Sequence, residues 1–323
     1  MGERAEPLVS VVVPTYDRPD RVERAVASVA GQTYDRIEVV VVDDCSETPV
    51  ADALSDGHAE AFERFEVIRH DRNRGGSAAR NTGIRASEGE YVALLDDDDR
   101  WEPEKLERQV GTFRRQDVGV VTTGAKVVDE DGRLLRRYRH DDLPGDSTAL
   151  TKQLLCRNVV GSCSAVVVDH EVIDAVGGFD ERFPSWQDLE WYVRLSRHCR
   201  FGAVPDPLLV YRRDADQRVS DDLDALTDRT YPLFVETFGP VAAEYGPLFE
   251  RKMRAWTTYR VGHQLVMAGR VGEARRFLTR AVGLYPFEST FYVHCLPALG
   301  GSPTYEAARR TKRALDGLAS ERR

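Results

Sequence analysis

The sequence predicts an α/β fold with a mostly parallel sheet, followed by a C-terminal all-α region. Short valine-rich apolar runs alternate with helical patterns through the first part of the chain. Polar residues directly follow several of these runs, as they do at the carboxyl edge of an open α/β sheet. Beyond about residue 220 only helical spacing remains. We therefore place one α/β domain at residues 1–219 and a helical region at residues 220–323.

The N-terminal segment predicts a first strand–helix–strand unit. The run from Leu8 to Val13 is almost entirely apolar, as expected of a central parallel strand. Pro19 stands at the first position of a helix, where proline is tolerated, and Gly31 ends that helix. Residues 37–42 form the second strand. Strand, helix and strand at this spacing predict a right-handed parallel unit.

The remaining elements of the first domain continue this alternation. Strands are expected at 65–69, 91–95, 118–123, 164–168 and 205–211, and helices at 77–86, 103–116 and 188–197. A hairpin is expected over residues 127–135, with its turn at Asp131-Gly132. Residues 136–150 are polar and are expected to form a long loop.

Four aspartates in succession, at 96–99, follow the strand expected at 91–95. Such a cluster repels itself unless it meets water or a cation. One interpretation is a solvated acidic turn ahead of a helix. The other is a divalent metal site at the carboxyl end of a strand, with oxygen ligands that suit Mg²⁺ or Mn²⁺ rather than Zn²⁺. Polar motifs at other strand ends favour the metal site, because they would converge on the same crevice.

Two further carboxylates are candidate site residues. Asp44 is the second carboxylate after the second strand. It is either a turn former or an acceptor for the ring N–H of a pyrimidine base. Asp188 lies near Trp186 and Trp191 and either caps the following helix or acts as a general base, with a pKa raised by the indoles. A general base must lie within hydrogen-bond reach of the acceptor hydroxyl. Glu190, two residues further along, is the alternative base.

The C-terminal region differs from the rest of the chain in charge and pattern. The net charge is −9, and residues 251–323 carry 14 Lys plus Arg against 5 Asp plus Glu, a local +9 that leaves −18 for the rest. The acidic body argues against nucleic-acid binding, whereas the basic region could face anionic lipid or a phosphate-bearing acceptor. Small residues spaced as in a single tetratricopeptide repeat predict a helical hairpin around residues 255–287, packed on neighbouring helices.

Several common classes of protein are disfavoured. No apolar run has the length of a spanning helix and the charged N-terminus is no signal peptide, so we expect a cytoplasmic protein. The dinucleotide motif G-x-G-x-x-G is missing after the first strand, and G-x-x-x-x-G-K-[ST] does not occur. The seven histidines show neither metalloprotease spacing nor a serine-hydrolase arrangement, and the five scattered cysteines are expected to be reduced.

The strand ends and their neighbours form an ordered series of motifs. They are VSVVVPTYDR from residue 9, QTY from 32, VVDD from 41, NRGGSAARNTG from 73, LLDDDD from 94, WEPEKL from 101, GGFDE from 177 and Gln187-Asp188. This series resembles the inverting glycosyltransferases of family 2 over about residues 8–215. The resemblance implies the GT-A fold, a Rossmann-like, mostly parallel sheet with helices on both faces. This chain departs from the family pattern at two places. Members often carry Glu-Asp where this chain has Gln187-Asp188. Many also carry a His after the Tyr-Arg-Arg that ends the last strand, where this chain has Asp214.

The resemblance implies a role for each candidate residue. The nucleotide-sugar would be bound by Pro14, Thr15, Tyr16, Asp44, Arg80 and Asp97. Asp96 and Asp98 would form the D-x-D pair around Mn²⁺ or Mg²⁺, and Asp188 would be the catalytic base that deprotonates the acceptor hydroxyl. The metal would neutralise the diphosphate leaving group. Inversion in a single displacement needs one carboxylate base and no enzyme nucleophile.

The resemblance also implies substrates and partners. The donor would be a nucleotide-sugar, with UDP favoured, and the missing Q-x-x-R-W motif of processive members favours transfer of a single sugar. With the basic C-terminal region and the apolar residues 296–299, it predicts a lipid-linked or glycan acceptor of surface glycan or glycoprotein assembly, and peripheral contact with the cytoplasmic face of the cell membrane. Two alternatives remain: a nucleotidyltransferase of related fold, which would not need Asp188, and a non-catalytic scaffold protein on a transferase fold.

Overall fold

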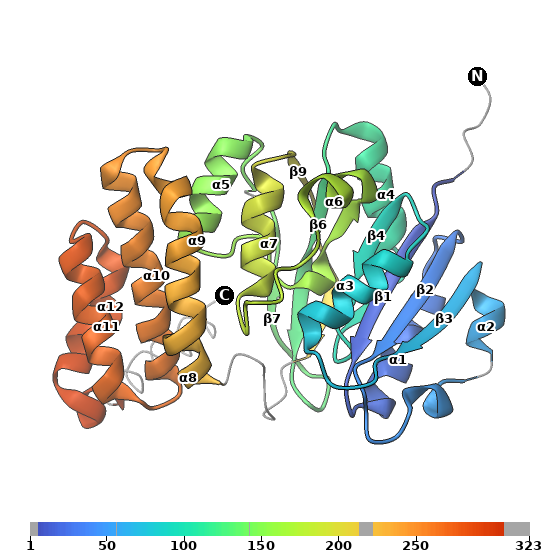
Figure 1. The fold of residues 1–323 in the computed structure, drawn as a ribbon, viewed down its shortest axis with the longest axis horizontal. Coiled ribbons are helices and arrows are strands. Elements are labelled where there is room, and N and C mark those ends of the chain that lie inside the picture. The colour runs from blue at the N-terminus through green and yellow to red at the C-terminus, as the bar shows by residue number, and fades with distance from the viewer. Residues whose placement is uncertain (1–5, 56, 142, 213–221, 307–323) are drawn as a thin grey trace, which may run out of the picture. The chain divides into compact units, whose positions relative to one another are not determined.

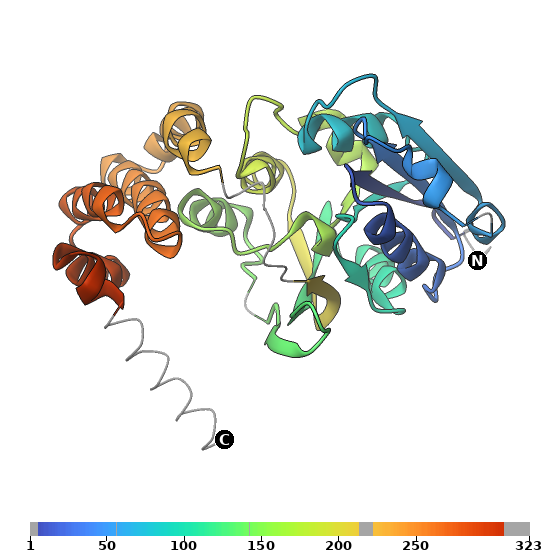
Figure 2. The ribbon, with the colours of Figure 1, turned by 90° about the horizontal axis from the view of Figure 1, so that it is seen from below.

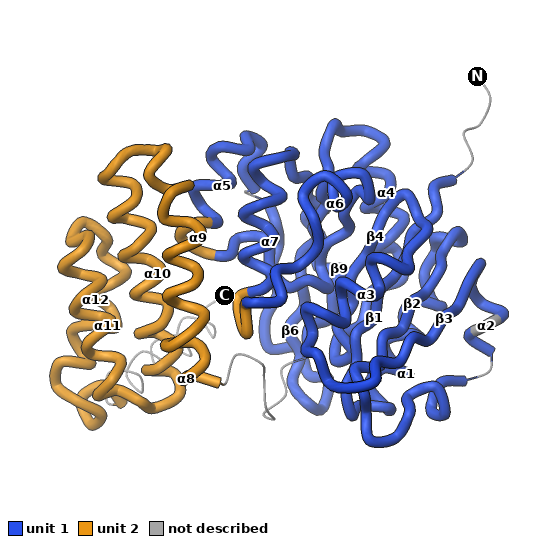
Figure 3. The backbone as a smooth tube through the Cα atoms, in the orientation of Figure 1, with its two compact units in different colours: residues 1–154, 158–182, 187–216 blue, residues 155–157, 183–186, 217–323 orange. Residues whose placement is uncertain are grey.

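The computed structural model describes residues 6–55, 57–141, 143–212 and 222–306. The chain forms two compact units, which Figure 3 shows in different colours. Unit 1 comprises residues 1–154, 158–182 and 187–216, and unit 2 comprises residues 155–157, 183–186 and 217–323. Unit 1 contains the sheet, and the elements described in unit 2 are helical. The expected class, an α/β domain followed by a helical region, is confirmed.

The sheet of unit 1 has the strand order β3-β2-β1-β4-β8-β6-β9-β5, with β7 paired to β6 (Figure 1). The strands are β1 Val9–Thr15, β2 Ile37–Asp43, β3 Arg64–Arg69, β4 Tyr91–Leu94, β5 Arg100–Trp101, β6 Val120–Val128, β7 Leu134–Tyr138, β8 Val167–Asp169 and β9 Phe201–Arg212. The first four pair in parallel, β8 runs antiparallel to β4 and β6, and β6 and β9 are parallel. The sheet is therefore mixed, with its parallel half at the N-terminal strands.

The helices between the strands cover both faces of this sheet. They are α1 Pro19–Ala30, α2 His58–Ala61, α3 Gly76–Ala86, α4 Lys105–Arg115, α5 Ser147–Cys156, α6 His170–Val176 and α7 Gln187–Ser196. Successive side chains of a strand face opposite sides of the sheet. Val11 and Val13 of β1 belong to the core that includes α1 and α4, which lie on the same face in Figure 2. Val12 lies against α3 on the other face, where a Cβ at Gly83 would come within 2.2 Å of it.

Three segments differ from the sequence-based expectation. The strand expected at 118–123 and the first strand of the hairpin are one strand, β6, because the chain continues through Gly124 with only a shift of register. A Cβ at Gly124 would lie 2.4 Å from the carbonyl oxygen of Tyr138, so glycine permits this close approach. The expected loop at 136–150 is shorter, since β7 runs to Tyr138 and α5 begins at Ser147.

Unit 2 is a set of packed helices. They are α8 Leu223–Ala225, a π-helical segment Leu226–Thr230, α9 Tyr231–Ala243, α10 Pro247–Met267, α11 Val271–Leu284 and α12 Ser289–Leu299. Gly269, with φ +82°, lies in the short turn between α10 and α11, and a Cβ at Gly262 would lie 2.9 Å from the Leu278 side chain. The small residues that suggested a repeat therefore let these two helices approach closely. Within the described residues, no helix combines the length and the apolarity that crossing a bilayer requires.

Candidate active site

The candidate residues converge at the carboxyl edge of the parallel strands. Thr15 and Asp43, the last residues of β1 and β2, are paired in register. The Leu95 N–H, at the end of β4, donates to the Val12 carbonyl at 3.0 Å, which brings the aspartates that follow to the same edge. Parallel pairing thus places three polar strand ends side by side, as the sequence pattern predicts.

The four aspartates alternate between buried and accessible positions. Asp97 is nearly buried, with a side chain 7% exposed, and accepts hydrogen bonds from the Thr15 hydroxyl at 2.8 Å and from Arg18 Nη1 at 3.0 Å. Asp96 and Asp98 are 27% and 33% exposed. Two of the residues expected to bind nucleotide, Thr15 and Asp97, therefore bond to each other, while the expected metal pair is the accessible one.

The charges of this cluster are only partly compensated. Burial raises the pKa of Asp97. Burial, together with repulsion from Asp96 and Asp97, raises the pKa of Asp98 to about 6, although Arg18 lies 3.5 Å from its carboxylate. Asp99 is buried, and its Oδ2 has no hydrogen-bond partner among the residues that the structure describes. Burial, followed by repulsion from Asp98, raises the pKa of Asp99 well above its usual value. A bound cation would relieve this repulsion.

A divalent ion fits the accessible pair only if the substrate completes the site. In the described part of the chain, no group of three or more His, Cys, Asp or Glu side chains is arranged to hold a metal ion. Mg²⁺ and ions of similar chemistry are nevertheless often bound through one or two carboxylates, with phosphate oxygens and water as the other ligands. The accessible oxygens of Asp96 and Asp98, in a cluster that repels itself, match that type of site.

Asp44 anchors the loop that leads into α3. Its Oδ1 accepts hydrogen bonds from His70 Nδ1 at 2.7 Å and from the Arg74 N–H at 2.9 Å, and its Oδ2 accepts from the Gly75 N–H at 2.7 Å. Gly75 has φ +86°, a conformation that favours glycine. The turn-forming interpretation of Asp44 is thus present in the structure. Because a carboxylate oxygen offers two lone pairs, Oδ2 can accept one further N–H.

The loop after β1 presents an aromatic side chain at this edge. Pro14 is buried within β1, whereas Tyr16 is 46% exposed. Asp17 and Cys45 adopt positive φ angles of 53° and 67°. The Asp17 N–H donates to the Ser46 hydroxyl at 2.9 Å, which ties the loop after β1 to the loop after β2. The exposed ring is therefore carried by a fixed loop.

Arg80 joins α3 to the acidic cluster. Its Nη2 donates to Asp96 Oδ1 at 2.5 Å, and its guanidinium carbon lies 5.6 Å from the centre of the Phe179 ring. Burial lowers the pKa of Arg80, but the attraction of the Asp96 carboxylate outweighs this effect. The pKa is raised overall, so the side chain is charged. Asn81, the next residue, holds the 177–180 loop through two hydrogen bonds to the Phe179 backbone, at 2.7 and 2.9 Å.

Asp188 lies in the first turn of α7, where Asn158 orients it. Asn158 Nδ2 donates to Asp188 Oδ2 at 2.8 Å, and Asn158 Oδ1 accepts from the Gly161 N–H at 2.9 Å. Burial raises the pKa of the Cys163 thiol, Arg80 lowers it, and the charges of both Asp96 and Asp188 raise it further. Cys163 thus lies within electrostatic range of Arg80 and of both carboxylates, which places Asp188 in the neighbourhood of the acidic cluster.

Glu190 is already used by the fold. It is buried and accepts from Arg194 Nε at 2.5 Å, and Arg194 Nη2 also donates to the Gly178 carbonyl. This ion pair links α7 to the 177–180 loop. Asp188, two residues earlier, is the more accessible of the two carboxylates.

Four residues of this site were not among the sequence-based candidates. Arg18 bonds to Asp97, Asn158 to Asp188, and the Ser164 hydroxyl accepts from the Asp96 N–H at 3.0 Å. His70 is buried and bonds to Asp44 and, through Nε2, to Thr82 Oγ1 at 3.0 Å. His70 follows a strand directly, a signal that could have found it. Asn158 lies in a loop and Ser164 in the short 3₁₀ helix Cys163–Ala165, and neither follows a strand. Arg213 and Asp214 lie outside the described residues.

Comparison with known families gives one family match. Residues 10–176 match the family model described as Glycosyl transferase family 2. Relatives include the putative teichuronic acid biosynthesis glycosyltransferase TuaG of Bacillus subtilis, 33% identical over 166 residues, which are 51% of this chain and 64% of that protein. The glycosyltransferase AglE of Haloferax volcanii is 28% identical over 190 residues, 58% of this chain and 61% of that protein. The chain thus spans less than two thirds of the length of each of these relatives.

Solved structures with the same fold cover nearly the whole chain. S. aureus TarS 1-349 in complex with UDP-GlcNAc has a TM-score of 0.67 and 17% identity, over 95% of this chain and 92% of that one. The mannosyltransferase PcManGT from Pyrobaculum calidifontis, in complex with GDP-Man and Mn²⁺, has a TM-score of 0.55 and 19% identity, over 96% of this chain and 88% of that one. At these identities the likeness establishes the fold, and it confirms the expected GT-A fold with a C-terminal helical region.

Proposed function

The chain belongs to glycosyl transferase family 2, and we propose that it moves a single sugar from a nucleotide-sugar, with UDP favoured, to an acceptor hydroxyl with inversion. The observation that carries this proposal is the meeting of three strand ends, an accessible carboxylate pair and Arg80 at one edge of the sheet, with Asp188 nearby. The family match favours a glycosyltransferase over the nucleotidyltransferase and scaffold alternatives.

On this proposal the acidic pair and Arg80 stabilise the leaving group. Asp96 and Asp98 are the residues that would hold Mn²⁺ or Mg²⁺, and such an ion, when bound, supplies positive charge to the departing diphosphate. Arg80 provides a fixed second charge, since α3 and Asp96 hold its guanidinium group in place. Preorganised charge of this kind lowers the barrier because it needs no rearrangement during the reaction. Thr15 and Arg18 hold Asp97 and so fix the loop that carries the pair.

Asp188 would act as the general base. Its carboxylate takes the proton of the acceptor hydroxyl while the acceptor oxygen bonds to the anomeric carbon, and the bond from that carbon to the diphosphate oxygen breaks on the opposite face. A single carboxylate suffices for this displacement, in contrast to the two carboxylates of retaining hydrolases. The hydrogen bond from Asn158 favours the ionised, oriented carboxylate that this step requires.

The nucleotide would lie across the loops after β1 and β2. The exposed ring of Tyr16 offers a surface for the base or the ribose, and Asp44 Oδ2 offers an acceptor for a ring N–H. UDP satisfies that acceptor through the uracil ring N–H. Structures of the same fold that hold UDP-GlcNAc and GDP-Man support a nucleotide-sugar donor.

The proposed acceptor is lipid-linked or a glycan of the cell surface. Two relatives are named for biosynthesis, one of teichuronic acid and the other of succinoglycan. Val293, Leu296 and Leu299 repeat at helical spacing along α12 and are exposed, in a region whose net charge is positive. An exposed apolar stripe within a basic region is compatible with a helix that lies at an anionic membrane surface. Peripheral contact with the cytoplasmic face of the membrane follows as part of the proposal.

Two substitutions test the proposed roles. The full chain would be incubated with Mn²⁺ and a panel of UDP-sugars, and UDP release would be measured with and without extracts that contain glycolipid acceptors. Asp188→Asn should abolish acceptor-dependent release but keep UDP binding, whereas Asp98→Asn should lose both. Asp131→Asn, an exposed turn carboxylate, is the matched control. Full transfer by Asp188→Asn would overturn the assignment of the base and favour a reaction that does not need it.

A further inference from the structure

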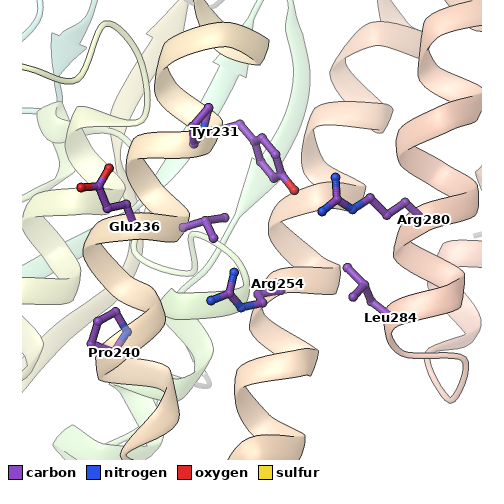
Figure 4. A pocket seen from close by; sticks show the side chains of 8 residues that line it. Tyr231, Glu236, Pro240, Arg254, Arg280 and Leu284 are labelled. Atoms are coloured by element: carbon purple, nitrogen blue, oxygen red, sulfur yellow. The ribbon is translucent and has the colours of Figure 1, made fainter.

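The polar groups around the hollow in unit 2 already have partners or face solvent. This hollow, of about 500 Å³, lies among α9, α10 and α11 (Figure 4). Arg254 is paired with Glu250, the Tyr231 hydroxyl is hydrogen-bonded to Thr258 at 3.1 Å, and Arg280 is exposed. None of the residues that line the hollow therefore buries an uncompensated charge that would attract a ligand.

A short segment of unit 1, residues 158–164, contacts both parts of the proposed active site. Near its start, Asn158 Nδ2 donates to Asp188 Oδ2 at 2.8 Å. At its end, the Ser164 hydroxyl accepts from the Asp96 N–H at 3.0 Å. This bridging segment thus joins the candidate base to the loop that carries the candidate metal pair.

The bridging segment is held in place by its own hydrogen bonds and by the sheet. Asn158 Oδ1 accepts from the backbone N–H groups of Val160 and Gly161, both at 2.9 Å. Gly161 has φ +105°, a conformation that favours glycine. The buried Thr122 hydroxyl of β6 donates to the buried Val160 carbonyl at 3.0 Å. The segment is therefore fixed to the sheet between its two contacts.

Ser164 holds the loop of residues 96–101 at two points. It is fully buried, and besides its bond to the Asp96 N–H, its carbonyl oxygen accepts from Trp101 Nε1 at 2.8 Å. Within the loop, the Asp99 N–H donates to the Asp96 carbonyl at 3.0 Å, which closes a turn over the two residues between them. Both ends of the loop that carries the carboxylate pair are therefore tied to one residue.

The ring at the far end of this loop is fixed as well. Trp101 is only 4% exposed and pairs with Leu209 of β9. Lys105 Nζ lies 3.8 Å from the centre of the Trp101 ring, on the other element that packs against it. Because the ring and the bridging segment are both immobile, the hydrogen bonds of Ser164 transmit that rigidity to the loop.

We infer that Ser164 is a positioning residue for the pair Asp96 and Asp98, and that the bridging segment fixes this pair relative to Asp188. The inference rests on the proposed function, which assigns the pair to the metal and Asp188 to the base. An inverting displacement needs the base and the leaving group on opposite faces of the sugar, so their separation matters. Hydrogen bonds that orient metal-binding carboxylates commonly change metal affinity by 10- to 100-fold.

Calorimetric titration of Mn²⁺ into the full chain, with UDP in excess, tests the role of Ser164. Ser164→Ala should raise the apparent dissociation constant of Mn²⁺ about tenfold. Ser164→Cys fills the same space with a weak acceptor and should show a similar loss. Ser87→Ala is the matched control, since its buried hydroxyl donates to the Gly83 carbonyl at the C-terminal end of α3 at 2.9 Å. It should leave the Mn²⁺ affinity unchanged.

Thr122→Val tests whether the bridging segment acts as a unit. The substitution removes the bond to the Val160 carbonyl without touching Asn158 or Ser164. It should weaken Mn²⁺ binding and also lower acceptor-dependent transfer, whereas Asn158→Ala should lower transfer alone. Thr122→Ser keeps the hydroxyl and should behave as the wild type. A loss in only one of the two measurements for Thr122→Val, or in neither, would overturn the shared positioning.

The remaining contrary results are distinguishable. Equal Mn²⁺ affinity for wild type and Ser164→Ala would overturn the positioning role of Ser164, as would an equal loss in Ser87→Ala or full recovery in Ser164→Cys. A circular dichroism melt of each variant reports whether it folds. UDP binding by the wild type that needs no Mn²⁺ would contradict the metal role in the proposed function. Mn²⁺-dependent UDP binding that Ser164→Ala and Ser164→Cys leave intact would refute this inference alone.

Discussion

Replacing Asp98 by asparagine should stabilise the metal-free protein although it removes a proposed metal ligand. The Asp98 carboxylate is partly buried beside Asp96 and Asp97, and Arg18 compensates its charge only in part. Asparagine has nearly the same shape but carries no charge. The substitution therefore removes the repulsion and the cost of burying the ion, while the backbone and neighbouring contacts stay in place.

The size of this effect follows from the pKa. A rise from 3.8 to about 6 corresponds to roughly 3 kcal/mol at 1.36 kcal/mol per unit. Because a third of the side chain is exposed, solvent screening reduces this to about 1–2 kcal/mol. The folded-state pKa is raised, so the native state takes up a proton first as the pH falls. The destabilisation is full above pH 6, is about half as large near pH 5, and disappears below the unfolded pKa of 3.8.

Urea denaturation in EDTA, followed by circular dichroism, measures this difference. Asp98→Asn should exceed the wild type in free energy of unfolding at about pH 7.5 and by about half as much at about pH 5. Asp131→Asn, an exposed carboxylate, should match the wild type at both. Two results would refute the claim that the aspartates of this cluster repel one another in the folded protein. One is a lower free energy of unfolding for Asp98→Asn than for the wild type. The other is a difference between the two proteins that stays the same at both pH values.

Four further predictions concern single contacts. Asn158→Ala should lower acceptor-dependent transfer about tenfold and leave UDP binding intact, because one orienting hydrogen bond to the base is lost; equal losses in both assays would instead indicate a misfolded loop. Asp44→Asn should cost about 1–3 kcal/mol in urea denaturation, since the partly buried Gly75 N–H loses its charged acceptor, and should weaken UDP binding in calorimetry. Gly83→Ala should cost about 1–3 kcal/mol in the same denaturation assay, because the new methyl group meets Val12, and an unchanged midpoint would contradict the close packing of α3. Leu296→Asp should reduce cosedimentation with anionic vesicles, and sedimentation equal to that of the wild type would count against the membrane proposal.

Much of the first domain could be predicted from sequence because its central strands are buried on both faces. The valine-rich runs of β1 and β2 admit few other structures, and Pro19 and Gly31 mark the ends of α1. The polar residues after these strands converge for a topological reason, since parallel strands end at the same edge.

The regions that sequence reasoning missed depend on long-range contacts. β6 continues past Gly124 because β9 and β7 supply partners on both sides, which no local pattern encodes. Asn158 meets Asp188 across 30 positions in the sequence, and Thr15 meets Asp97 across 82.

Calorimetric titration of UDP into the metal-free protein, with and without Mn²⁺, tests the central claim most directly. We expect UDP binding that depends on Mn²⁺ and disappears in Asp98→Asn, because the ion would join the accessible carboxylates to the diphosphate. Asp131→Asn should bind as the wild type does. If UDP, GDP and dTDP all fail to bind in the presence of Mn²⁺, the edge formed by β1, β2 and β4 is not a nucleotide-sugar site, and the proposed transferase chemistry is contradicted.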